Sequence, residues 1–207
     1  MRERETLRRF FPEAVLTYCL ELWHHYAFTF KITRKRATKL GDYKYHPSSK
    51  KHTITVNNDL NSYAFLVTYL HEVAHLITYK SHGRSVLPHG KEWKNAFREV
   101  MQPVLNTNVF PGDLLYQLQR YLENPKASSC NDHALTSALA RYDKYPGTIL
   151  KDIEPGSLFK HGKKTYQKEA LRRTRYICKE VKSGRRYLIS KSAPVEPLTV
   201  TPPGGNG

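Results

Sequence analysis

Apolar residues recur at helical spacing in five stretches of the chain, which are residues 12–26, 58–80, 89–105, 112–124 and 133–145. Such spacing predicts amphipathic helices. The first begins at Pro12, a residue favoured at the first position of a helix. The second is the strongest, because Asn61 or Ser62 can cap it and its apolar residues form one continuous face. Pro103 is expected to end or kink the third.

Three shorter stretches alternate polar residues with apolar or β-branched ones, which predicts strands. They are AFTFKITR, KLGDYKYH and HTITVNN, within residues 27–58. The segment HPSSKKH between the last two supplies Pro and Ser for a turn. We therefore expect a small antiparallel sheet. Its exposed face is expected to be basic and to carry Lys31, Arg34, Lys35, Arg36, Lys39 and Lys44.

The composition changes at Pro146, after which β-forming residues dominate and KSGR is a plausible hairpin turn. The last residues are rich in Pro and Gly, which predicts disorder. The fold class expected is α+β. The expected division is a first domain over 1–105, a helical connector over 106–149, a basic β-rich module over 150–191 and a disordered tail over 192–207.

Charge changes this picture, because 34 Lys and Arg residues oppose 18 Asp and Glu residues, for a formal net charge of +16. An excess of this size favours a polyanionic partner, most often nucleic acid. Twelve of the cations lie between residues 160 and 191, interleaved with tyrosines that can stack on unpaired bases. The candidate contacts are Lys163, Lys164, Arg172, Arg173, Arg175, Arg185 and Arg186. The alternative is a solvated sheet whose tyrosines pack inward.

Other classes of protein fit less well. No apolar run approaches the roughly 20 residues that span a bilayer, and MRERETLRRFF does not resemble a secretory signal. The expected compartment is the cytoplasm, with association to the nucleoid possible. Cys19, Cys130 and Cys178 are odd in number and far apart, so reduced thiols are expected. Cys130 and His133 together make only half of a zinc site.

The strongest chemical signal is HEVAH on the second predicted helix. His71 and His75 are four residues apart, so both imidazoles lie on one face and can bind one ion. Glu72 beside them can activate a metal-bound water, which is the H-E-x-x-H arrangement of zinc peptidases. Zinc suits this donor set. The competing interpretation is two hydrogen-bonded histidines and a surface carboxylate.

A hydrolytic zinc site needs a third protein ligand. The longer pattern H-E-x-x-H-x-x-G-x-x-H fails, because Thr78 and Ser81 replace its glycine and histidine. His82 at the helix end is a weaker candidate, and Glu92 and Glu99 are possible carboxylate ligands. His89 in PHGKEW is preferred, since the preceding loop is long enough to return it to the helix. The expected set is His71, His75 and His89.

The segments ITVNNDL, VTYLHEVAHLITY and PHGKEWKNAFREVM resemble the SprT-like family, which includes bacterial SprT proteins and the protease domain of Spartan. The resemblance covers roughly residues 12–102. It implies a zincin-like fold, zinc on the three histidines, Glu72 as general base and a protein substrate. Spartan degrades proteins crosslinked to DNA and is activated by DNA, so proteins bound to DNA are possible substrates.

Two features depart from the family pattern. Many members carry a C-terminal four-cysteine zinc ribbon, whereas only Cys178 is present here, and the 111–145 stretch has no counterpart. The function expected is a zinc metallopeptidase associated with nucleic acid. Tyr69, Tyr79 and His82 are candidates for stabilising the oxyanion. The alternatives are a non-catalytic DNA- or RNA-binding protein with a structural zinc, and another metal-dependent hydrolase of the same geometry.

Overall fold

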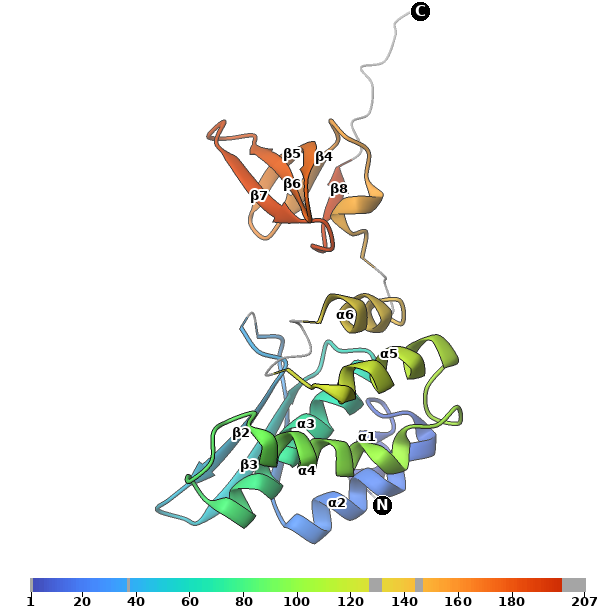
Figure 1. Cartoon of the computed structure of the whole chain (residues 1–207), viewed down its shortest axis with the longest axis vertical. Helices are drawn as coiled ribbons and strands as arrows, with labels where there is room; N and C mark the ends of the chain where they lie inside the picture. The colour runs from blue at the N-terminus through green and yellow to red at the C-terminus, as the bar shows by residue number, and fades with distance from the viewer. Residues whose placement is uncertain (1, 37, 127–131, 144–146, 199–207) are drawn as a thin grey trace, which may run out of the picture. The chain divides into compact units, whose positions relative to one another are not determined.

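The computed structural model describes residues 2–36, 38–126, 132–143 and 147–198. The chain forms two compact units, Met1–Lys144 and Tyr145–Gly207, and Figure 1 shows the elements of each. The first unit holds all the α-helices of the described residues and a three-stranded sheet. The second holds a five-stranded sheet. The expected α+β class is confirmed.

Helices dominate the first unit. In chain order its elements are α1 (Arg2–Leu7), the 3-10 helix η1 (Glu13–Val15), α2 (Leu16–Tyr26), β1 (Thr29–Thr33), β2 (Gly41–His46), β3 (Lys51–Asn57), α3 (Ser62–His82), α4 (Lys91–Met101), η2 (Gln102–Val104), α5 (Gly112–Glu123) and α6 (His133–Ala140). Every predicted helix is present, whereas α1 was not predicted. At the predicted break the chain passes from α4 into η2, which contains Pro103.

Helix α3 is the centre of this unit, and it contacts α4 as well as strands β2 and β3. The Asn61 side chain caps it by accepting hydrogen bonds from the backbone N–H groups of Tyr63 and Ala64. The Tyr69 hydroxyl donates to the carbonyl of Cys19 and so joins α3 to α2. Fully buried Phe65, Leu66, Leu70 and Val73 hold the helix in the core. The histidine motif therefore lies on a rigid element.

The prediction of an antiparallel sheet is wrong for one of its three strands. The order is β1-β3-β2, with β2 antiparallel to β3 but β1 parallel to β3. The connection from β1 to β2 crosses the end of β3, where Arg36 Nε donates to Asn57 Oδ1 at 2.7 Å. Asn57 Nδ2 donates in turn to the carbonyl of Lys39. This crossing puts β3 in the middle, so β1 cannot form a hairpin with β2.

The predicted connector over 106–149 is not a separate segment, because α5 and α6 pack into the first core. Leu114, Leu118 and Leu135 are fully buried in it. Arg98 on α4 donates to the carbonyls of Leu122 and Glu123. Asn61 Nδ2, at the start of α3, donates to the carbonyl of Leu139 on α6. The boundary between units falls at 144/145 instead of 105.

The second unit is an antiparallel sheet with the order β7-β6-β5-β4-β8 (Figure 1). Its elements are η4 (Leu150–Asp152), β4 (Leu158–His161), β5 (Lys164–Arg172), β6 (Arg175–Glu180), β7 (Arg186–Ser190) and β8 (Glu196–Leu198). The predicted turn is confirmed, with Gly184 at a φ of 70°. The predicted disorder is wrong for residues 192–198, because β8 pairs with β4. Residues 199–207 lie outside the described residues.

Candidate metal centre

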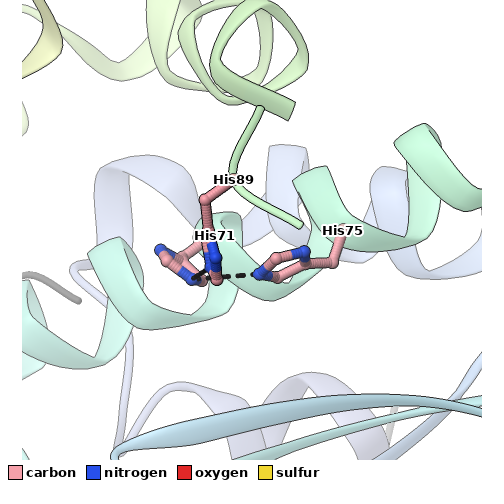
Figure 2. Close-up of side chains that lie close together, drawn as sticks. All are labelled: His71, His75 and His89. Carbon is pink, nitrogen blue, oxygen red and sulfur yellow. Dashed lines mark hydrogen bonds between the residues drawn. The ribbon is translucent and has the colours of Figure 1, made fainter. Parts of the chain in front are cut away.

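Three histidines converge on one point in the first unit, and Figure 2 shows their rings facing one another. His71 and His75 lie one turn apart on α3, whereas His89 belongs to the loop before α4. The Nε2 atom of His71 is 3.2 Å from that of His75 and 3.3 Å from that of His89. The structure thus brings together the three residues that the sequence predicted as ligands.

The environment keeps these imidazoles neutral. Burial lowers the pKa of His71 to about 2 and that of His75 to about 3, and the neighbouring histidines add to both effects. Burial also lowers the pKa of His89. A neutral imidazole has a free lone pair, which is the form that binds a metal.

The donor set fits zinc. Two nitrogens of a tetrahedral zinc site, each about 2.05 Å from the ion, lie about 3.3 Å apart. The two Nε2–Nε2 distances of 3.2 and 3.3 Å match this value. Within the described part of the chain, no other group of three or more His, Cys, Asp or Glu side chains has metal-binding geometry. The site can therefore hold one ion and leave its fourth position open.

The backbone at His89 departs from ordinary geometry, since its φ is 61°. A non-glycine residue in this region costs on the order of 1 kcal/mol or more, and such strain concentrates at functional sites. Trp93, fully buried on α4, supports the arrangement. Its ring centre is 4.6 Å from that of His71 and 4.7 Å from that of His89, and its Nε1 donates to the His71 carbonyl.

Glu72 is a buried carboxylate, only 7% exposed, and not a surface charge. Burial and the nearby Asp42 raise its pKa to about 8, against the opposing effect of the Tyr43 backbone N–H and the cations Arg36 and Lys39. All four of these residues lie on β2 or in the connection that leads to it. The interpretation of HEVAH as histidines beside an exposed glutamate is therefore wrong for Glu72.

Gly41 at the start of β2 forms the surface against which the Glu72 carboxylate packs. A Cβ atom at this position would lie 2.7 Å from Glu72 Oε1 and 2.7 Å from Thr68 Cγ2. No real Cβ approaches other atoms so closely, so a side chain here would displace the carboxylate. Glycine is required at position 41 to place Glu72.

The other sequence candidates lie elsewhere. His82 is the exposed last residue of α3, and Glu99 is exposed on α4 near Tyr26. Neither these two nor Glu92 joins the histidine group. Tyr69 is excluded as an oxyanion donor, because its hydroxyl is bound to the Cys19 carbonyl in the core. Cys130 lies outside the described residues.

Sequence reasoning did not assign roles to Tyr43 and His52, which extend the site along the sheet. The Tyr43 ring stacks on His75 at 6.5 Å between centres and 8° between planes, and its hydroxyl lies 2.8 Å from His52 Nδ1. No spacing rule connects a strand residue with a helix motif, so the sequence held no signal for this contact. For Trp93, a large apolar residue in the predicted 89–105 helix, the sequence indicated burial but not contact with the histidines.

The seven basic candidates in the second unit are all exposed, but two are paired. Lys164 contacts Glu180 at 3.0 Å and Arg186 contacts Glu169 at 2.9 Å. Arg172 and Arg175 lie directly opposite each other at the tip of the β5–β6 hairpin. With Arg173 and Leu188 they line a hollow of about 530 Å³.

Of the interleaved tyrosines, Tyr166 is buried and stacks on Phe159, whereas Tyr187 is partly exposed. The inward-packing alternative therefore holds for Tyr166.

Together the fold and the site define an α+β protein with a candidate three-histidine metal centre. A sequence profile of the SprT-like family matches residues 8–111, half of the chain, and the chain therefore belongs to this family. Proteins named Protein SprT from Escherichia coli O157:H7 and from Escherichia coli O1:K1 are each 40% identical to it over 80 residues. The same holds for Protein SprT from Shigella boydii serotype 18.

These alignments cover 37% of this chain and 44% of each relative, so the chain spans less than half the length of the relatives it matches. No solved structure matches the chain significantly. Among the described residues, the helices are all too short or too polar to cross a membrane.

Proposed function

We propose that this protein is a zinc-dependent metallopeptidase with a zincin-like catalytic domain. The observation that carries the proposal is the placement of a buried carboxylate, Glu72, on the same helix as two of three imidazoles spaced for one tetrahedral ion. A zinc ion bound there acts as a Lewis acid, which lowers the pKa of a water molecule and polarises a peptide carbonyl.

The residues of the chain supply the remaining chemistry. His71, His75 and His89 would hold the ion with their Nε2 atoms. The charge of a bound zinc ion would favour the ionised form of Glu72, which would then take a proton from the attacking water and return it to the leaving amine. The backbone N–H of Tyr43 and the close approach of Gly41 orient that carboxylate. Tyr79 lines the adjacent cavity and remains a candidate for contacting the oxyanion.

Two observations favour catalysis over the alternative of a structural zinc in a non-catalytic nucleic-acid-binding protein. Structural zinc sites are closed by four protein ligands, whereas the group found in the described residues has three. Burial of the Glu72 carboxylate next to the ligands also costs free energy, and a role as general base gives a reason for its position there. The open position and Glu72 together are what hydrolysis needs.

Association with nucleic acid is a second part of the proposal, and the β5–β6 hairpin supports it. Like charges directly opposite each other in a sheet are destabilising, so Arg172 facing Arg175 favours a site for an anion. No ion pair joins either side chain to a described acidic residue. Phosphates of single-stranded DNA would fit this hairpin, with low sequence specificity. Proteins bound or crosslinked to DNA are then the candidate substrates.

The test is a Glu72→Gln variant, assayed for cleavage of histone and casein with and without single-stranded DNA. We expect elemental analysis to find the same zinc content in the variant as in the wild type. The rate of cleavage should fall by about 10²–10⁴-fold, which is the usual contribution of a general base. Glu99→Gln, an exposed glutamate on α4, is the matched control and should retain full activity. Equal activity of wild type and Glu72→Gln would show that the proposed function is wrong.

A further inference from the structure

A cavity of about 410 Å³ opens directly beside the metal centre, with His75 and Trp93 in its lining. Tyr43 and Tyr45 on β2 line it from the sheet, and Thr78 on α3 lines it from the helix. Its volume is near the lower end of ligand cavities, about 300–1,000 Å³, and suits one large side chain with its adjoining backbone. The position of His75 places this side chain close to the reacting peptide bond.

The walls formed by β2 and α3 are aromatic and held in place. Tyr45 and Tyr79 pack with ring centres 4.6 Å apart, and Tyr43 is fixed between His75 and His52. Thr78 Oγ1 is also occupied, because it donates to the Ala74 carbonyl. The hydroxyl groups of Tyr43 and Thr78 therefore already have hydrogen-bond partners and are not free to bind a polar side chain.

The opposite wall is the loop between α3 and α4, where Val86, Leu87 and Pro88 line the cavity. Leu87 is 77% exposed, the most exposed large apolar side chain of the described residues. An apolar group entering the cavity would remove this side chain from water, which is favourable. Leu87 thus points to an apolar occupant.

Two cations, Lys44 and Arg84, complete the lining, and no acidic residue belongs to it. Neither cation is in ion-pair contact with an acidic side chain in the described ranges. A lysine or arginine side chain would enter against both charges and find no partner. The cavity therefore selects against basic residues.

We propose that this cavity is a specificity site for a bulky apolar or aromatic side chain of the polypeptide substrate, next to the bond that is cleaved, and that it excludes Lys and Arg. This inference rests on the proposed peptidase function. Its chemistry follows from the aromatic wall, the exposed Leu87 and the two cations.

Binding to the zinc-loaded Glu72→Gln protein tests the cavity without turnover. The probes are the peptides acetyl-Gly-Gly-Xaa-Gly-Gly-amide with Phe, Ala or Lys at Xaa, measured by calorimetry. Burial of the Phe side chain is expected to make the Phe peptide bind about tenfold or more tightly than the Ala peptide. The Lys peptide should bind more weakly than the Ala peptide at low salt, and this difference should shrink at high salt.

Leu87→Ala in the same background should reduce the preference for Phe over Ala several-fold. Leu171→Ala, the same change at an exposed leucine of the second unit, is the matched control and should leave the preference unchanged. Arg84→Glu should raise the affinity for the Lys peptide until it is close to the affinity for the Ala peptide. Equal binding of the Phe and Ala peptides, or binding of neither, would overturn the inference.

Cleavage mapping on a digest of mixed proteins separates this inference from the proposed function. Wild-type cleavage at sites without enrichment of Phe, Tyr, Leu or Met would contradict the specificity site and leave the peptidase intact. Enriched cleavage that Leu87→Ala reduces would support both. Absence of Glu72-dependent cleavage, together with Phe-selective and Leu87-dependent binding, would refute the peptidase and retain an apolar side-chain site.

Discussion

At the scale of single residues, the metal centre depends on neutral imidazoles that face one another with no charged partner among them. Burial lowers the pKa values of His71, His75 and His89, so their lone pairs are available at neutral pH. The Nε2 atoms of His75 and His89 lie 3.2 and 3.3 Å from that of His71, and one metal ion could bind all three nitrogens. This geometry, more than the motif by itself, argues for a bound metal.

The ligand set can be tested with four single substitutions. His71→Ala, His75→Ala and His89→Ala should each lower zinc affinity by at least about tenfold, because each removes one of three donors. His82→Ala removes a nearby histidine outside the group and should leave affinity unchanged. Competition titration against a chromogenic chelator measures this. Loss of zinc in His82→Ala with retention in His89→Ala would contradict the assigned third ligand.

Gly41 offers a test of how Glu72 is positioned. Gly41→Ala would place a Cβ atom 2.7 Å from the carboxylate and so displace it. Because misplacement of a catalytic group by about 1 Å can cost 10²-fold, we expect kcat to fall by at least about tenfold with zinc affinity unchanged. Gly112→Ala, where nothing lies within 4 Å of the added atom, is the control. Full activity in Gly41→Ala would show that this contact does not orient the base.

At the scale of elements, the second sheet depends on a buried lysine, which is one of the twelve cations between residues 160 and 191. Lys168 on β5 is 2% exposed, and its Nζ donates to the carbonyls of Lys151 and Ile153. The ammonium also lies 4.0 Å from the centre of the Tyr176 ring. One cation therefore joins η4 to the sheet and is not available to bind a polyanion.

Lys168→Met should destabilise the second unit. It leaves the carbonyls of Lys151 and of buried Ile153 without this donor, and an unsatisfied buried acceptor costs about 1–3 kcal/mol. It also removes the contact with the Tyr176 ring. Amide hydrogen exchange in β4, β5 and β6 should accelerate, while exchange in α3 should not change. Lys163→Met, at an exposed position, is the matched control and should stay within about 0.5 kcal/mol of wild type. Unchanged amide exchange in Lys168→Met would mean that the buried cation makes no net contribution to the stability of the second unit.

At the scale of the whole molecule, the chain divides its chemistry between two units. The candidate metal centre and its cavity lie in Met1–Lys144. The β5–β6 hairpin with Arg172, Arg173 and Arg175 lies in Tyr145–Gly207. Each unit has its own hydrophobic core. Zinc binding and nucleic-acid binding are therefore expected to be separable.

A truncated chain of residues 1–144 should keep zinc and lose most affinity for single-stranded DNA. In the full chain, replacing Arg172, Arg173 and Arg175 by Ala should lower the slope of log Kd against log salt by about 2, since each contact to single strands contributes about 0.7. The double change of Lys164 and Arg186 to Ala is the control, because both are already paired with glutamates. Fluorescence anisotropy measures the DNA affinity of the truncated chain and of the substituted full chains. Equal DNA affinity of the truncated and full chains would contradict the assignment to the second unit.

The sequence by itself determined what depends on local spacing. Apolar periodicity placed every described α-helix except α1, Asn61 marked the start of α3, and the spacing of His71 and His75 placed both on one face. The residues KSGR, which are typical of a hairpin turn, located the turn between β6 and β7. These features follow from contacts among residues a few positions apart, so a linear pattern contains them.

Only the tertiary structure decided the features that join distant segments. It joined β1 to β3 in parallel, buried Glu72 against Gly41, brought Tyr43 onto His75, and placed the ammonium of Lys168 in a core. It also assigned α5 and α6 to the first unit. The physical reason is that packing and burial are set by which surfaces meet in space. Hydrophobic patterning along a chain says which side of an element is buried, but not what buries it.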